Sequence, residues 1–234
     1  MGPGDRRAVE VARTPQPIDG RHPTGSDPWW GEAWGFDWGL PDGSLGGFVE
    51  VTIVARQRAA WFWAAVTGTG RRAVLCRDVD LALPADPDVL ELRGDALWTH
   101  AICETPLAHW TVAMEAFAVA LDDPFDAWHG ERGDRIGLAF DLEWENRTGD
   151  LRWAGDSGYR VACTVNGDLQ VGDESWTSLS AAGHRWHSWG IMAPFAAADH
   201  GTNTAGHRVA YLVPSRDGPV RARRQLRPDG TWTI

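Results

Sequence analysis

The amino-acid sequence predicts an all-β protein, built from antiparallel barrels or sandwiches with little helix. Many short apolar segments are separated by turn residues roughly every 8 to 12 positions, which is typical of such folds. Several segments alternate apolar and polar residues with the period of a half-buried strand. The Asn166-Gly167 dipeptide predicts a tight hairpin turn between two of these segments. A chain of 234 residues can form one large β domain or two small ones.

A polar, turn-rich stretch at Asp122–Asp134 divides the segments into two sets. We therefore expect a flexible arm over 1–28, an N-terminal β domain over 29–130 and a C-terminal β domain over 131–234. The arm is rich in proline, glycine, arginine and aspartate, and it shows no hydrophobic period.

The first half is expected to contain seven strands. These are Trp29–Trp38, Phe48–Ala55, Ala60–Val66, Arg72–Leu83, Val89–Arg93, Trp98–Glu104 and Trp110–Leu121. The second and third are almost continuously apolar, which predicts a hairpin in the centre of a sheet. Thr111–Leu121 contains residues that favour helix, but its neighbours favour a long strand.

The second half continues the pattern. Its expected strands are Ile136–Glu145, Tyr159–Val165, Asp168–Val171, Trp176–Leu179, His184–Gly190, His207–Val213, Val220–Leu226 and Thr231–Ile234. The first of these alternates strictly, and we interpret its charged side as a solvated face. An Asp229-Gly230 turn precedes the last.

Composition excludes several classes of function. The net charge of −10 argues against a nucleic-acid surface, and the absence of lysine excludes Schiff-base catalysis. No apolar run approaches the roughly 20 residues that span a bilayer, and the first residues lack the apolar segment of a secretory signal. A cytoplasmic protein is therefore expected. Cys76, Cys103 and Cys163 have no C-x-x-C spacing, so neither a disulfide framework nor a zinc site is indicated.

The stretch His184–Gly190 is the most informative part of the chain, because it combines two histidines, two indoles and an arginine. In extended conformation Arg185, His187 and Trp189 share one face, and the other face carries His184 and Trp186. Either face offers an aromatic ring beside a proton-transfer group. A structural histidine among core tryptophans explains the same pattern, and both interpretations stay open.

Candidate proton-transfer groups are those flanked by apolar residues. They are His187, Glu32, His184, Glu104, His100 and Glu115. A carboxyl group buried among indoles is expected to have a raised pKa and to donate a proton near neutrality. Candidate substrate-binding residues come from the excess of tryptophan, 15 in all. They are Trp30, Trp34, Trp38, Trp61, Trp63, Trp98, Trp110, Trp186 and Trp189, together with Arg185.

No motif for a cofactor or a metal is found in the sequence. Nucleotide-binding glycine motifs and a hydrolase elbow are absent. His184 and His187 are three residues apart on an expected strand, so their side chains leave opposite faces. Cys103 and His100 are separated in the same way, which argues against a Cys-His pair. We expect chemistry that needs neither cofactor nor metal.

Four segments resemble a known family. Gly183–Gly190 resembles the G-x-R-D-H-S-W-G signature of actinobacterial proteins related to hydroxyneurosporene synthase and carotenoid 1,2-hydratase. Trp30–Phe36 is similar to the family's W-x-E-S-W-x-F, Glu104–Trp110 to E-x-P-L-x-x-W, and Phe140–Glu145 to a segment that opens the second half. The resemblance covers about Trp29–Thr233. The wider set is lipocalin-like and includes fungal decalin-forming Diels–Alderases.

The resemblance implies two packed lipocalin-like β domains with a hydrophobic pocket for polyenes, terpenoids or polyketides, and no cofactor. Trp186 stands where the family has aspartate. If that aspartate donates the proton for hydration, simple hydratase activity is in doubt here, and a large ring fits a pocket rebuilt to clamp a substrate. The chain also looks short for the family, as if the second domain were trimmed.

We expect a cofactor-independent cyclase or isomerase, of the pericyclase or hydratase–dehydratase kind, acting on a lipophilic natural-product intermediate. His187 or Glu32 would steer a proton, while the pocket holds a reactive conformer. The alternative is a non-catalytic carrier of an apolar ligand. A third hypothesis, a carbohydrate-binding module, is based on the number of tryptophans alone. The expected partner is a lipophilic small molecule, with no nucleic acid, no membrane span and a monomer or homodimer.

Overall fold

The computed structural model describes residues 18–86, 89–146, 148–149, 151–191 and 206–233. Within these ranges the regular structure is β apart from two short 3-10 helices, so the expected all-β fold is confirmed. The strands are β1 (Trp30–Gly39), β2 (Gly46–Val54), β3 (Ala59–Thr67), β4 (Val74–Leu81), β5 (Leu90–Gly94), β6 (Leu97–Thr105), β7 (His109–Leu121), β8 (Gly133–Glu145), β9 (Leu151–Trp153), β10 (Gly158–Val171), β11 (Glu174–Ile191), β12 (His207–Val213) and β13 (Val220–Leu226). The 3-10 helices are η1 (Ala55–Gln57) and η2 (Asp126–Trp128). No helix in these ranges is long and apolar enough to cross a membrane.

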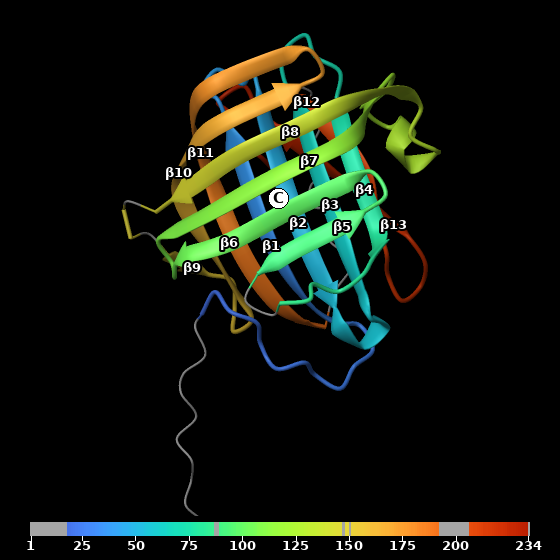
Figure 1. The fold of residues 1–234 in the computed structure, drawn as a ribbon, viewed down its shortest axis with the longest axis vertical. Helices are drawn as coiled ribbons and strands as arrows, with labels where there is room; N and C mark the ends of the chain where they lie inside the picture. The colour runs from blue at the N-terminus through green and yellow to red at the C-terminus, as the bar shows by residue number, and fades with distance from the viewer. Residues whose placement is uncertain (1–17, 87–88, 147, 150, 192–205, 234) are drawn as a thin grey trace, which may run out of the picture.

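The large sheet is antiparallel and closes on itself. Its strands follow the order β4-β3-β2-β1-β11-β10-β8-β7-β6-β5, and β4 also pairs with β7. The closing contact joins Val74 to Ala120 and Leu75 to Val119. Figure 1 shows the green strands β5–β7 crossing in front of the blue strands β1 and β2. The interior between them is therefore enclosed by a β-barrel, with the β5–β6 hairpin extending the wall beside β7.

The expected division into two β domains at residue 130 does not hold for the sheet. β7 and β8 lie on either side of that point, yet they pair continuously from His109 and Glu145 to Leu121 and Gly133. β1 likewise pairs with β11, from the opposite half of the chain. The polar stretch after β7 is a hairpin connection, and turn-rich composition is common to hairpin loops and domain linkers.

The sheet has an apolar layer on each side of β2 and β3. Val49, Val51 and Phe62 point into the barrel, while Trp61 and Trp63 point outward. The hairpin β12–β13 covers the outward face, where Trp63 Nε1 donates to the carbonyl of Leu212 at 3.2 Å. This double burial explains why both strands are almost continuously apolar in the sequence.

Two expectations about individual segments have different outcomes. Thr111–Leu121 is part of β7, so the prediction of a strand is confirmed. The hairpin predicted at Asn166-Gly167 is wrong, because β10 continues through this dipeptide with a register shift between Gly167 and Leu169. β10 has partners on both sides here, β8 and β11, which favours a bulge over a turn. The chain reverses later, where Val171 pairs with Glu174.

Candidate functional site

A short segment without regular secondary structure, Ile18–His22, lies against the ends of β1 and β11. We call it the covering segment. Asp19 is buried, and its carboxylate accepts hydrogen bonds from the guanidinium of Arg185 and the backbone N–H of Leu107. Trp34 Nε1 donates to the Asp19 carbonyl at 3.3 Å. Ile18–His22 is therefore a packed part of the molecule, contrary to the expected flexible arm over 1–28, whose first 17 residues lie outside the described ranges. The missing hydrophobic period of this stretch argues against helix and strand. It does not argue against an ordered coil, which side-chain contacts can hold in place.

The register between β1 and β11 places the central residues of the site. Trp34 lies opposite His187, Glu32 opposite Trp189, and Phe36 opposite Arg185. Directly opposed residues share a face, so these side chains gather at one end of the barrel interior. Arg185 and His187 are buried, so of the two faces that alternation distinguishes on β11, the face of these residues points into the barrel.

Glu32 and His187 form the centre of the site. His187 Nε2 lies 2.8 Å from Glu32 Oε1, and both side chains are almost fully buried. The imidazole of His187 stacks on Trp34 at a centroid distance of 4.6 Å. His22 approaches from the covering segment, with Nδ1 2.7 Å from Glu32 Oε1 and its backbone N–H donating to Glu32 at 2.9 Å. His22 in turn stacks on Trp189 at 3.6 Å.

The hydrogen-bond partners of His187 determine where protons lie. Nδ1 is 3.1 Å from the carbonyl oxygen of Ile18. A carbonyl only accepts, so Nδ1 carries a hydrogen. The contact between Nε2 and Glu32 Oε1 then needs one further proton, on the imidazole or on the carboxyl group. The pair thus holds a transferable proton in an apolar setting, which is the arrangement that general acid–base chemistry requires.

A buried ion pair lies beside the contact between Glu32 and His187. Arg185 donates from Nη1 to Asp19 Oδ1 at 2.7 Å and to the hydroxyl of Tyr159 at 3.1 Å. Both charged groups are nearly inaccessible to water. This pair joins β11 to the covering segment and fixes the carbonyl of Ile18 that orients His187.

The same cluster is also the place where an ion could bind. His22, Glu32 and His187 offer ligand atoms within 4.8 Å of one another. Two histidines and a carboxylate are a known set of transition-metal ligands, and the Nδ1 contact of His187 resembles the support that such ligands receive. The hydrogen bonds described above already satisfy these atoms. The sequence did not point to this cluster, because His22 belongs to the aperiodic segment.

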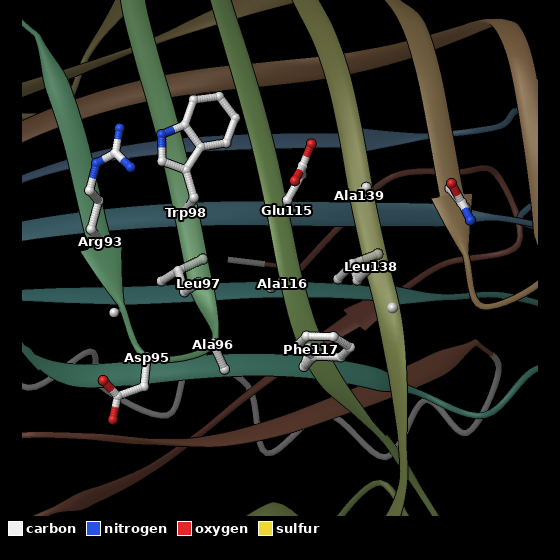
Figure 2. Close-up of a pocket in the computed structure, with 13 residues that line it drawn as sticks. Arg93, Asp95, Ala96, Leu97, Trp98, Glu115, Ala116, Phe117, Leu138 and Ala139 are labelled. Atoms are coloured by element: carbon white, nitrogen blue, oxygen red, sulfur yellow. The ribbon is translucent and has the colours of Figure 1, made fainter.

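The remaining candidate proton-transfer groups lie outside the barrel. His184 is on the outward face of β11, where Nδ1 is 3.2 Å from Asp37 Oδ1. His100 and Trp98 stack on the outer face of β6, and Glu104 and Glu115 are exposed. Trp98 and Glu115 line a hollow of about 620 Å³ over β5–β8. Figure 2 shows the two side chains on β6 and β7. None of these side chains contacts Glu32 or His187 within the described ranges.

The candidate tryptophans divide among four surroundings. Trp34, Trp38 and Trp110 lie inside the barrel, and Trp144, which the sequence did not single out, lies with them. Trp61 and Trp63 belong to the layer under β12–β13. Trp30 and Trp189 are partly buried near the covering segment, while Trp98 and Trp186 face away from the interior. A ligand at His187 can therefore touch only a part of this set.

Trp186 lies flat against the outer face of the sheet, over Gly35. A Cβ atom on Gly35 would come within 1.9 Å of the indole, and the guanidinium of Arg224 lies 4.7 Å from the ring. The residue that replaces the family's aspartate thus packs under β13 and does not reach the interior.

Gly35→Ala is therefore expected to lower the free energy of unfolding by about 1–3 kcal/mol, because the indole must move. Urea denaturation followed by tryptophan fluorescence measures this change. Gly137→Ala on β8 is the matched control, since a Cβ there meets nothing within 4 Å. Equal stability of the two variants would contradict the close packing of Trp186.

The three cysteines are not suited to nucleophilic chemistry. Burial raises the pKa of each thiol, of Cys76, Cys103 and Cys163, to about 12. At pH 8 about one thiol in ten thousand would be ionised, and only the thiolate reacts. We expect a chromogenic disulfide reagent to react slowly with the native protein and rapidly with all three thiols in urea. If the thiols of the native protein reacted with the reagent as fast as free cysteine does, this expectation would be wrong.

Comparisons with known proteins give one family and a distant structural likeness. No curated protein matches the chain. The crystal structure of kievitone hydratase from Nectria haematococca is similar at 13% identity and a TM-score of 0.41, over 87% of this chain and 63% of that one. The chain thus spans 63% of the length of that enzyme. The model of the family DUF7064, a domain of unknown function, matches residues 16–199. The chain therefore belongs to the DUF7064 family.

Proposed function

We propose that this protein is a cofactor-independent isomerase or cyclase that moves a proton on an apolar small molecule, with Glu32 and His187 as the proton-transferring pair. The observation that carries the proposal is the buried 2.8 Å contact between His187 Nε2 and Glu32 Oε1. A group that exchanges a proton with a neighbour in a dry site can lend it to a bound molecule and recover it afterwards.

The surroundings favour an apolar substrate. The faces of Trp34 and Trp189 and the edge of Tyr159 border the two imidazoles. Indole faces can also stabilise a developing positive charge, by about 1–2 kcal/mol for each desolvated contact. Such rings suit polyene, terpenoid or polyketide intermediates. The resemblance of the β11 motif to proteins that handle these molecules supports the same class.

A substrate can touch the pair only after the covering segment has moved. His187 is completely buried and Glu32 is 2% exposed. His22 lies over them and keeps one-fifth of its own surface in solvent. Displacement of Ile18–His22 would open the end of the barrel next to Trp34. Closure over the substrate would then exclude water during proton transfer.

The proposal is tested by proton exchange in heavy water. The protein is incubated in D2O with a panel of lipophilic polyenes, terpenoids and polyketides, and products are analysed by mass spectrometry. We expect deuterium at a carbon position of an isomerised or cyclised product, and no incorporation with Glu32→Gln. Saturable quenching of tryptophan fluorescence by one of these compounds, without product or deuterium, would favour the carrier and overturn the proposal.

A further inference from the structure

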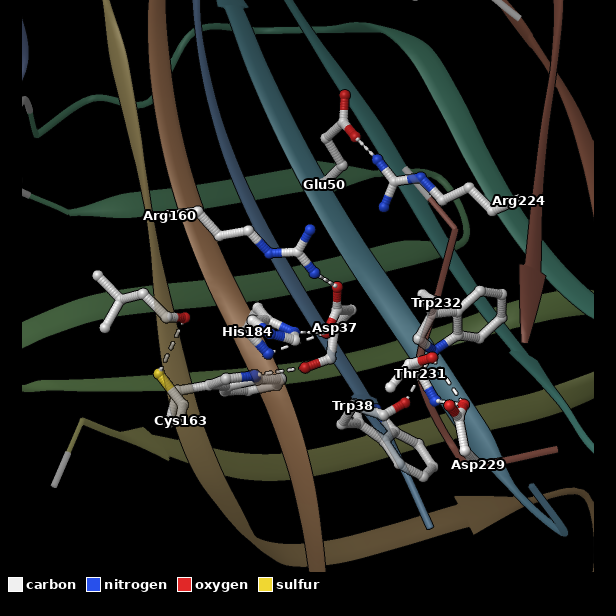
Figure 3. Close-up of polar contacts among 12 residues, drawn as sticks. Asp37, Trp38, Glu50, Arg160, Cys163, His184, Arg224, Asp229, Thr231 and Trp232 are labelled. Carbon is white, nitrogen blue, oxygen red and sulfur yellow. Dashed lines mark hydrogen bonds and ion pairs between the residues drawn. The ribbon is translucent and has the colours of Figure 1, made fainter. Parts of the chain in front are cut away.

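A second hollow lies on the outside of the barrel, between β9–β11 and the end of the chain. It has a volume of about 400 Å³. Its lining is Arg152, Arg160, Ala162, His184, Arg227, Asp229, Thr231 and Trp232. Figure 3 shows Arg160 and His184 on one side, with Thr231 and Trp232 on the other. Three guanidinium groups thus meet in one place on a chain whose net charge is −10.

The strand pairing forces two of these cations together. Arg152 on β9 lies directly opposite Arg160 on β10. Like charges at directly opposed positions of a sheet repel each other and destabilise the pairing. Burial lowers the pKa of Arg160, and the positive charges of Arg224 and Arg152 lower it further, against the opposing effect of Asp37. A bound anion would relieve this repulsion.

Two carboxylates lie at this hollow, and one of them, Asp37, is already a partner of Arg160. Asp37 accepts from Arg160 Nη2 at 3.1 Å and from the backbone N–H of His184 at 2.9 Å. Asp229 accepts from the hydroxyl and the backbone N–H of Thr231. The Nε–H group of Arg160 is buried without an acceptor. Within the described ranges, no carboxylate accepts a hydrogen bond from Arg152 or Arg227, and both side chains are exposed.

We propose that this hollow binds a phosphate group, either the free ion or a phosphate ester of a small molecule. Guanidinium groups match phosphate oxygens with paired, charge-assisted hydrogen bonds. Arg160, Arg152 and Arg227 supply such groups from three segments around the hollow. The site is separate from the proton-transfer pair, because His184 and His187 point to opposite faces of β11. It does not depend on the proposed enzymatic function.

Isothermal titration calorimetry with inorganic phosphate and with phenyl phosphate, at low ionic strength, tests this site. We expect saturable binding that Arg227→Gln weakens about tenfold, since a hydrogen bond between charged groups is lost. Arg132→Gln, at an exposed arginine on the loop before β8, is the matched control and should bind as the parent does. Tighter binding of phenyl phosphate than of phosphate would identify an ester as the ligand, and equal binding would identify the ion.

Arg160→Gln removes a partner of the buried Asp37 and can weaken the fold, so Arg152→Gln serves as the second binding variant. Its side chain is exposed, and its removal relieves repulsion on Arg160. We expect weaker phosphate binding together with unchanged or increased thermal stability. Absence of saturable heat with the parent protein, or equal phosphate affinity in Arg227→Gln, Arg152→Gln and Arg132→Gln, would overturn the proposal.

Discussion

Replacing Glu32 with glutamine is expected to lower the turnover number for the apolar substrate by about 10²- to 10⁴-fold. The amide has the shape of the carboxyl group and can still hydrogen bond to His187, but it can neither release nor take up the proton. Substrate binding should change little, because the aromatic rings remain. Steady-state kinetics that separate kcat from KM measure this effect.

Two companion variants test the assignment. In the proposed mechanism Glu32 and His187 act as one unit, so His187→Gln should be equally impaired, and the double variant should be no worse than either single one. Glu115→Gln, at an exposed carboxylate on the outer face of β7, is the control and should retain full activity. Unchanged kcat in Glu32→Gln would remove the acid–base role.

The cluster of His22, Glu32 and His187 allows a sharper distinction between proton transfer and metal chemistry. A proton-transferring pair is insensitive to a chelator. We expect the activity of protein dialysed against EDTA to equal that of the untreated protein. Loss of activity on chelation, with recovery on adding back a divalent transition metal, would show that these atoms bind an ion.

Much of the inner half of this site could be predicted from the sequence. Alternation groups Glu32 with Trp34 on one face of β1 and Arg185 with His187 on one face of β11, because the two-residue period of a strand depends only on local geometry. That both faces point inward is seen only in the structure. These four side chains come together because β1 pairs with β11, and the sequence pattern does not predict this pairing. Periodicity shows which face a side chain occupies, while the partner strand is decided by contacts across the whole chain.

The covering segment could not be predicted in this way. Asp19 and His22 belong to a stretch whose composition is typical of disorder. Asp19 is held by Arg185 on β11, which is far away in the sequence, and His22 is held by Glu32 on β1. Such docking depends on individual side-chain partners and leaves no periodic signal in the sequence.

The excess of tryptophan predicts a pocket lined by indoles, but the structure divides the indoles between two buried layers. Trp61 and Trp63 instead fill a second apolar layer, between the barrel and β12–β13, and Trp232 caps this layer by donating to the carbonyl of Trp38 at 2.8 Å. Two buried layers need more large side chains than one, so residue count alone does not indicate a pocket.

Asp19→Ala is expected to destabilise the protein by about 3–5 kcal/mol, because the buried guanidinium of Arg185 loses its counter-ion. Both members of this pair are almost completely inaccessible, at 1% exposure for Asp19 and 2% for Arg185. The variant also removes the acceptor for the backbone N–H of Leu107. Urea denaturation measures the loss, and Asp19→Asn should lose less, because it keeps an oxygen for Leu107.

The matched control is an exposed pair with equally good geometry. Arg71 and Glu174 form two hydrogen bonds of 2.7 Å at the surface, and solvent screens their charges. Glu174→Gln should therefore leave the urea midpoint unchanged. If Asp19→Ala were as stable as Glu174→Gln, the buried ion pair would not hold the segment in place.

The same variant links stability to the site. Asp19 fixes the segment whose Ile18 carbonyl orients His187 and whose His22 covers Glu32. Once Asp19 is removed, the segment should leave the end of the barrel, and Trp34 and Trp189 should become accessible to acrylamide in conditions where the barrel is still folded. Global unfolding would quench all tryptophans together, whereas release of the segment would quench only a fraction of them at low acrylamide concentration. Increased quenching without loss of β-sheet circular dichroism would therefore show that the covering segment opens as a separate unit, as the proposed access of a substrate to Glu32 and His187 requires.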